Sequence, residues 1–350
     1  MISPPSVYLA LAMTLNGADS TTRDAMLETL AAQGLTVTDI NHAARSWITS
    51  LNRASEKTTV SITNSIWFDQ NFVPFQPFLQ ANADYFNAAA QKLDFKDPQT
   101  LDIINGWVSE ATNGRIEQII NQIRPDAVMF LINAIYFLAD WEIPFEKADT
   151  RSQAFLAPDG EVEVDFMHRT GAMKFYQLEG ATGIGLPYAD DRFAFFAVLP
   201  AADTDARAWL SGQDPALLFD EVAAGLRQDP LVVDLALPKF ESRYEDSLIN
   251  ELSQMGMGLA FQPDQADFTQ MINSHEKIIY IGEVKHKSFV RVDEKGTEAA
   301  AATSVEMRVT SIPYSEHQIV FDRPFVYGIM DLATGLPLFT GVLEKPEPAS

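Results

Sequence analysis

VDEKGTEAAAATSVEMRVTSIP, residues 292–313, follows a predicted strand near the C-terminus and decides how the rest of the chain is interpreted. Four alanines after Thr297 and Glu298 favour a short helix, because alanine has the highest helix propensity and threonine is a good N-cap. The same residues also alternate with a period of two, which is typical of a half-buried strand. One face is small and apolar from Thr297 to Met307, whereas every charge from Glu298 to Arg308 lies on the other face. The segment is therefore suited both to exposure and to pairing in a sheet.

The composition excludes several classes of protein. The 350 residues are 47% hydrophobic and 21% charged, as is usual for globular proteins. A net charge of −23 argues against a nucleic-acid partner, whose phosphates would be repelled, and agrees with simple solubility. No cysteine is present, which excludes thiol catalysis, disulfides and thiolate metal sites, and the five histidines are not paired as a zinc site requires. No apolar run approaches the ~20 residues of a membrane span.

Helices predominate in the first third of the chain and strands in the rest, which predicts an α+β fold. The predicted helices cover residues 7–15, 22–32, 38–54, 77–90, 99–114, 203–226 and 246–255. The predicted strands cover 57–69, 127–137, 231–244, 277–292, 325–331 and 336–343, with paired strands over 155–175 and a hairpin over 184–200. The apolar run 127–137 suits a central strand buried on both faces, inside which Asn133 needs hydrogen-bond partners. The helix over 99–114 is expected to direct Ile103, Ile104, Trp107 and Val108 inward.

Several short motifs occur in an order that resembles the serpin family. Residues 105–116 carry the pattern N-x-W-V-x-x-x-T-x-G-x-I, and 133–137 read NAIYF, followed by Trp141 and Pro144-Phe145. Further matches are LPKF at 237–240, ADF at 266–268, FDRPF at 321–325, and Pro337, Leu338, Phe339 and Gly341. The resemblance covers nearly the whole chain, and the hinge is closest to that of inhibitory members, including prokaryotic ones.

The resemblance implies a single domain over 1–350, with three β-sheets, eight or nine helices and an exposed reactive centre loop at 294–313. The residues that would form its hinge are Glu294, Gly296, Thr297, Glu298, Ala299, Ala300, Ala301 and Ala302. Counted from Glu294 as the family is counted, the bait bond is Thr310–Ser311, to within one or two residues. The family's usual first helix has no counterpart, so the chain is expected to begin at the second helix.

The resemblance also marks two groups of residues that would control opening of the sheet. Ser3, Ser6, Asn133 and His286 match positions where the sheet opens. We expect Asn133 and His286 on adjacent strands, bonded to each other or to nearby hydroxyls; the alternative for His286 is a core histidine with no regulatory role. Trp141, Lys239 and Glu294 match the region where insertion begins. A Lys239–Glu294 pair would hold the entry point of the loop, or it would be a surface ion pair worth ~0–1 kcal/mol.

The implied activity is suicide inhibition of serine proteases rather than catalysis, with no catalytic residue, metal or cofactor. Thr310 predicts an elastase-like or subtilisin-like target, and Arg308 allows a trypsin-like protease to cut. Two alternatives within the family are a non-inhibitory binding or chaperone module and a cross-class inhibitor of a cysteine protease. A Ser-His-Asp hydrolase is a third class, but no G-x-S-x-G elbow is present. A monomer without nucleic-acid or membrane partners is expected.

The N-terminal residues do not resemble a signal peptide, because no basic region precedes an apolar core. The localisation is left open, with an extracellular or cell-surface location favoured over others.

Overall fold

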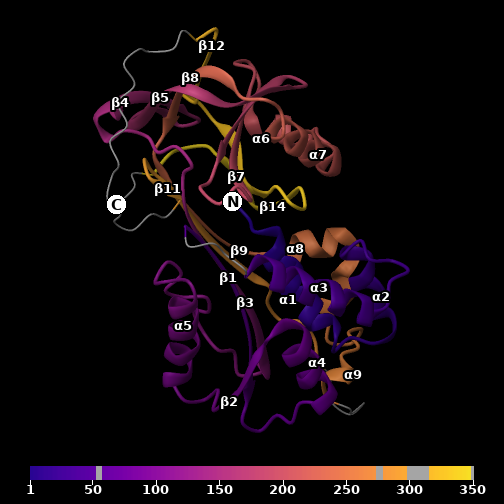
Figure 1. Cartoon of the computed structure of the whole chain (residues 1–350). Helices are drawn as coiled ribbons and strands as arrows, with labels where there is room; N and C mark the ends of the chain where they lie inside the picture. The colour runs from indigo at the N-terminus through magenta and orange to yellow at the C-terminus, as the bar shows by residue number, and fades with distance from the viewer. Residues whose placement is uncertain (53–56, 273–278, 298–314, 348–350) are drawn as a thin grey trace.

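A six-stranded sheet, called the large sheet below, runs through the middle of the molecule (Figure 1). Its strand order is β2-β1-β3-β11-β10-β9. Its strands are β1 (Thr58–Asp69), β2 (Ala89–Leu93), β3 (Met129–Asp140), β9 (Phe240–Ser247), β10 (Lys285–Val292) and β11 (Gly296–Thr297). The computed structural model describes residues 1–52, 57–272, 279–297 and 315–347.

The large sheet consists of two groups of strands, β2-β1-β3 and β10-β9, which in the described part of the chain meet only through β11. β1 and β3 pair from Thr58–Ala139 to Phe68–Met129, and β9 and β10 pair along the whole length of β10. Within the described residues, no ladder joins β3 directly to β10, and the two residues of β11 pair with both. The sheet is therefore interrupted between β3 and β10 everywhere except at one end.

A second, eight-stranded sheet is divided into two parts by the long strand β5. The first residues of β5 pair with β4, its middle pairs with β8, and its last residues pair with β6. The strand order is β12-β8-β5-β6-β7-β13-β14, with β4 beside β5. The strands are β4 (Arg151–Ala157), β5 (Gly160–Leu178), β6 (Ala181–Pro187), β7 (Phe193–Pro200), β8 (Leu231–Pro238), β12 (His317–Val320), β13 (Phe325–Asp331) and β14 (Leu336–Leu343). Together with the large sheet, these two parts account for the expected three-sheet architecture.

The helices cover the sheets on different sides, and nine α-helices lie within the described part of the chain. They are α1 (Pro4–Leu15), α2 (Ser20–Thr29), α3 (Val37–Leu51), α4 (Gln76–Phe86), α5 (Gln99–Ala111), α6 (Ala206–Ser211), α7 (Pro215–Leu226), α8 (Ile249–Leu252) and α9 (Thr269–Ile272). In Figure 1, α1 to α4 lie on one side of β1 and β3, and α5 lies alone on the other side. Helices α6 and α7 cover the second sheet. The α+β prediction is confirmed.

Local sequence explains where several helices begin and end. α1 begins with two prolines, which suit the first turn because its N–H groups need no helical partner. α3 begins with a capping box, in which Thr36 and Asp39 exchange side-chain and backbone hydrogen bonds. α4 ends where Asn87 adopts a left-handed conformation with φ of 51°. This turn ends the helix before β2, so the predicted helix over 77–90 is too long.

The predicted strand over 231–244 is wrong in a way that matters for the site. The structure has two strands here, β8 in the second sheet and β9 in the large sheet, separated at Lys239. The backbone amide of Lys239 donates to the carbonyl oxygen of Asp165, 2.8 Å away. Lys239 therefore lies where the chain passes from one sheet to the other, and only tertiary packing determines that position.

Other predictions need smaller corrections. Within the described residues 279–292 of the predicted strand over 277–292, only Lys285–Val292 is strand, and the helix over 203–226 is divided into α6 and α7. Ile103 was expected to point inward but is 43% exposed, because α5 buries only one narrow side. No helix among the described residues is long and apolar enough to cross a membrane.

Candidate functional site

The chain reverses direction at the end of β10 and enters the large sheet. After Val292 it turns through Asp293, Glu294 and Lys295, and the backbone amide of Asp293 donates to the carbonyl oxygen of Gly296 at 3.0 Å. Thr297 then pairs with Val292 on one side and with Ala139 of β3 on the other. The first two residues after the turn thus occupy the space between β3 and β10, antiparallel to both.

Gly296 is the residue that allows this close approach. A Cβ at this position would lie 2.0 Å from the carbonyl oxygen of Ala139 and 2.8 Å from the Cα of Asp140. Both atoms belong to the backbone of β3, which cannot rotate away as a flexible side chain could. A glycine is required here by close packing rather than by an unusual φ angle.

The predicted contact between Lys239 and Glu294 is present. The Lys239 Nζ lies 3.1 Å from Glu294 Oε1, and the hydroxyl of Thr150 donates to the same oxygen at 2.9 Å. Burial opposes ionisation of Glu294, but hydrogen bonds from the backbone, Lys239 and Thr150 outweigh it and lower the pKa of the carboxyl. The glutamate side chain is only 7% exposed, so this is a partly buried ion pair rather than the surface pair considered above.

Trp141 holds the other side of the turn. Its indole Nε1 donates to the carbonyl oxygen of Asp293 at 2.8 Å. Its backbone amide donates to the carbonyl oxygen of Lys295, also at 2.8 Å. The amide of Phe145 donates to the carbonyl oxygen of Glu294, also at 2.8 Å. Three consecutive carbonyl groups of the turn are therefore bound by the segment that follows β3.

Sequence reasoning missed Tyr188, although it touches the buried hinge residue. Thr297 is 1% exposed, and its hydroxyl is hydrogen-bonded to the phenol of Tyr188. The Tyr188 ring stacks on Trp141 with centroids 4.7 Å apart, and burial raises the pKa of Tyr188 above its usual value. Tyr188 comes from the connection between β6 and β7, far from both partners in sequence. No local pattern could have paired it with them.

The residues expected at the opening of the sheet are brought together only in part. Asn133 donates from Nδ2 to the Oδ1 of Asn64 at 2.8 Å, and His286 accepts from the backbone amide of Ser3 at 3.1 Å. Asn133 and His286 were expected to bond to each other or to nearby hydroxyls, but each bonds to another group, and no ladder joins β3 to β10 in the described part of the chain. Ser6 is buried in the first turn of α1.

Among the described residues, the Oδ1 of Asn133 and the Oγ of Ser3 are buried without a hydrogen-bond partner. Burial lowers the pKa of His286 to about 4, so the ring is neutral at pH 7 and its Nε2 is free to accept from Ser3. The regulatory roles of these residues stay predictions.

The remaining predicted residues lie outside the described part of the chain. They are the hinge residues Glu298, Ala299, Ala300, Ala301 and Ala302, and the bait residues Thr310 and Ser311.

Comparison with known proteins places this geometry in a family. The family model described as serpin (serine protease inhibitor) matches residues 1–346. The chain is a serpin. An uncharacterized serpin-like protein of Thermococcus kodakarensis is 30% identical to it, over 99% of this chain and 80% of the relative.

Two serpins of known structure are similar to this chain in fold. The native state of tengpin, a thermophilic serpin, matches with a TM-score of 0.90 and 37% identity, over 98% of this chain and 88% of tengpin. Its latent state matches with a TM-score of 0.84. Human thyroxine-binding globulin, solved in complex with thyroxine, matches with a TM-score of 0.85 and 26% identity, over 99% of this chain and 91% of the globulin. Serpins are in general protease inhibitors that work by conformational change, but some members, such as thyroxine-binding globulin, are non-inhibitory.

Proposed function

We propose that this serpin is a suicide-substrate inhibitor of serine proteases. A protease serine attacks the bait bond and forms an acyl-enzyme, and the cut loop then inserts between β3 and β10 as a new strand. The observation that supports this is the position of β11. Gly296 and Thr297 already lie between those two strands, antiparallel to both, at the end where insertion begins.

Extending the register of β11 supports insertion of the rest of the loop. Thr297 pairs with Ala139, so each later residue would lie opposite one earlier residue of β3. The positions facing the main core would then be Ala299, Ala301, Thr303, Val305 and Met307, opposite Phe137, Ile135, Asn133, Leu131 and Met129. All are small or apolar, as burial on this face demands. Thr303 would place a hydroxyl beside the Asn133 Oδ1, which has no partner at present.

The other face of the same strand also fits. The positions opposite Tyr136, Ala134 and Ile132 would be Ala300, Ala302 and Ser304. Ile132 packs under α5, so small residues suit this part of the face. The charged residues Glu298, Glu306 and Arg308 would fall toward the two ends of the strand, beyond the most crowded part.

The position of the bait bond comes from the count used in the family, which starts at Glu294. We infer cleavage at Thr310–Ser311 or a neighbouring bond, and a target with a small or medium pocket, such as an elastase-like or subtilisin-like protease. A trypsin-like protease would cut after Arg308. The inserting segment would then be shorter, and cleavage without trapping is expected.

The test is incubation with a panel of elastase-like, subtilisin-like and trypsin-like proteases, with a cysteine protease included. A complex stable in SDS, together with the N-terminal sequence of the released peptide, would establish both the trap and the bond. A stable complex with the cysteine protease alone would make the protein a cross-class inhibitor instead. Cleavage without a complex by every protease, and without a gain in thermal stability, would overturn the proposal and favour a binding module such as thyroxine-binding globulin exemplifies.

A further inference from the structure

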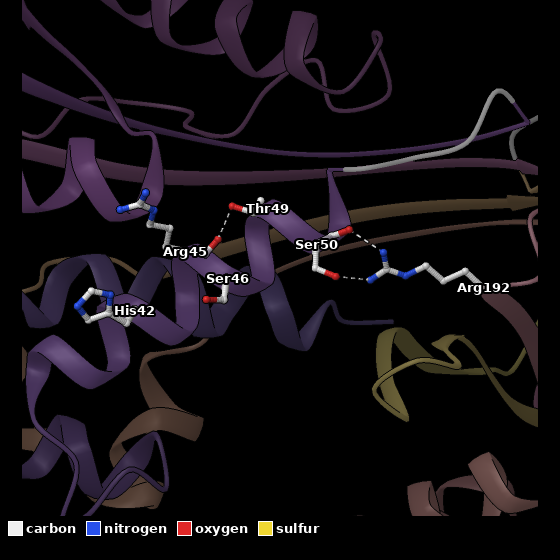
Figure 2. A pocket seen from close by; sticks show the side chains of 6 residues that line it. All are labelled: His42, Arg45, Ser46, Thr49, Ser50 and Arg192. Carbon is white, nitrogen blue, oxygen red and sulfur yellow. Dashed lines mark hydrogen bonds between the residues drawn. The ribbon is translucent and has the colours of Figure 1, made fainter.

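Arg192 lies in the connection between β6 and β7 and binds two distant parts of the chain. Its Nε and Nη2 donate to the two carboxylate oxygens of Asp331, each at 3.0 Å. Its Nη1 donates to the carbonyl oxygen of Ser50 at 2.6 Å, and Nη2 also donates to the Ser50 hydroxyl at 3.1 Å. Figure 2 shows the guanidinium reaching Ser50 at the edge of a hollow along α3. One side chain therefore joins the last turn of α3 to the end of β13.

The end of α3 is in turn bound to the large sheet. Asn52, directly after the helix, accepts from the backbone amide of Ile62 at 2.9 Å and donates to its carbonyl oxygen at 3.3 Å. Ile62 lies in the middle of β1, which pairs with β3 along most of its length. Because of these bonds, α3, β1 and β3 are expected to move as one unit.

The same connection that carries Arg192 also contacts the hinge. The amide of Ala189 donates to the carbonyl oxygen of Asp140 at 2.9 Å, and Tyr188 is bonded to Thr297. The side chain of Asp190 accepts from the amide of Arg192 at 3.1 Å, which keeps the connection compact. Within five residues the chain thus touches α3, β13, the end of β3 and the buried hinge residue.

We propose that the Arg192–Ser50 contact is a latch that slows opening of the large sheet. Opening requires the unit of α3, β1 and β3 to move away from β10. That motion pulls Ser50 from Arg192, which the buried carboxylate of Asp331 holds in place. This inference concerns the regulation of loop insertion and so rests on the proposed function.

Substitutions of Ser50 test the latch in both directions. Ser50 is exposed, so charged side chains are accommodated there. Ser50→Arg places a like charge beside Arg192 and leaves the Arg192–Asp331 pair intact, whereas Ser50→Asp adds a carboxylate partner. Thr49→Arg and Thr49→Asp are matched controls, because Thr49 is exposed on the same turn and its hydroxyl donates to the carbonyl oxygen of Arg45 at 2.7 Å.

The readout is amide hydrogen exchange at Trp141 and Phe145, whose amides donate to the hinge turn. We expect exchange about tenfold faster in Ser50→Arg and several-fold slower in Ser50→Asp, with both Thr49 variants unchanged. Equal effects at positions 49 and 50, or no effect of Ser50→Arg, would overturn the latch. Exchange does not depend on inhibition, so a wild type that traps no protease would refute the proposed function without affecting this result.

Discussion

Gly296 lies so close to β3 that a Cβ at this position would be 2.0 Å from the carbonyl oxygen of Ala139. This contact, between β11 and the backbone of the strand that it pairs with, shows how closely the chain after the turn packs inside the large sheet.

Gly296→Ala is expected to expel β11 from the sheet, because the backbone of Ala139 cannot yield to the new methyl group. We expect a loss of about 1–3 kcal/mol in the free energy of unfolding, measured by urea titration, and more cleaved protein per trapped protease. Gly106→Ala is the matched control, since a Cβ there meets no atom within 4 Å. A Gly296→Ala protein with unchanged stability and unchanged trapping would contradict the close packing described here.

Thr297→Arg is expected to convert the inhibitor into a substrate. Thr297 is 1% exposed and bonded to Tyr188, so an arginine would have to bury an unpaired charge in order to insert. The measurement is the fraction of protease recovered in an SDS-stable complex, which should fall to near zero. Thr297→Ser keeps the hydroxyl and the small volume and should still trap protease. Stable complexes with Thr297→Arg would refute insertion along this face.

Removing Lys239 is expected to weaken the hinge by leaving Glu294 with fewer partners. Lys239→Met should lower the free energy of unfolding by about 1–2 kcal/mol, because the lysine is partly exposed while the carboxylate is buried. A double-mutant cycle with Glu294→Gln measures the coupling directly. Additive effects of the two substitutions would show that the ion pair contributes nothing.

The Lys239–Glu294 pair should make the free energy of unfolding depend on pH, in a direction set by the pKa of Glu294. The pKa of Glu294 is lowered in the folded protein, so its contribution is present above the unfolded pKa and is lost as the pH falls through the folded pKa. Lys239→Met should reduce this acid-dependent loss. An identical pH profile for the wild type and Lys239→Met would contradict the assignment.

His286 should make the protein less stable in mild acid. Its folded pKa of about 4 lies below the unfolded value of ~6.5, so the unfolded chain binds the proton more tightly. Stability should fall as the pH drops below ~6.5 and level off near 4, by about 3 kcal/mol in total. Urea unfolding at several pH values measures this loss, which His286→Gln should largely remove. A wild-type stability profile that is flat from pH 7 to 4 would contradict this prediction.

The sequence alone was enough to predict several strands, the family and one contact at the site. Patterns of apolar residues predict β1 and the β6–β7 hairpin, because strand preferences act between neighbours in the chain. Ordered motifs identified the family, and the pairing of Lys239 with Glu294 followed from it. Small residues on alternate positions indicated a segment able to enter a sheet.

Tertiary structure alone decided the contacts that connect distant segments. The break at Lys239, the stacking of Tyr188 on Trp141 and the reach of Arg192 from Asp331 to Ser50 join residues that are far apart in sequence. Asn133 and His286 were expected to bond to each other or to nearby hydroxyls, yet Asn133 bonds to Asn64 and His286 to the amide of Ser3, and β3 and β10 are not paired in the described part of the chain. Sequence patterns report which side of an element is buried, but only the packed sheets determine what lies opposite it.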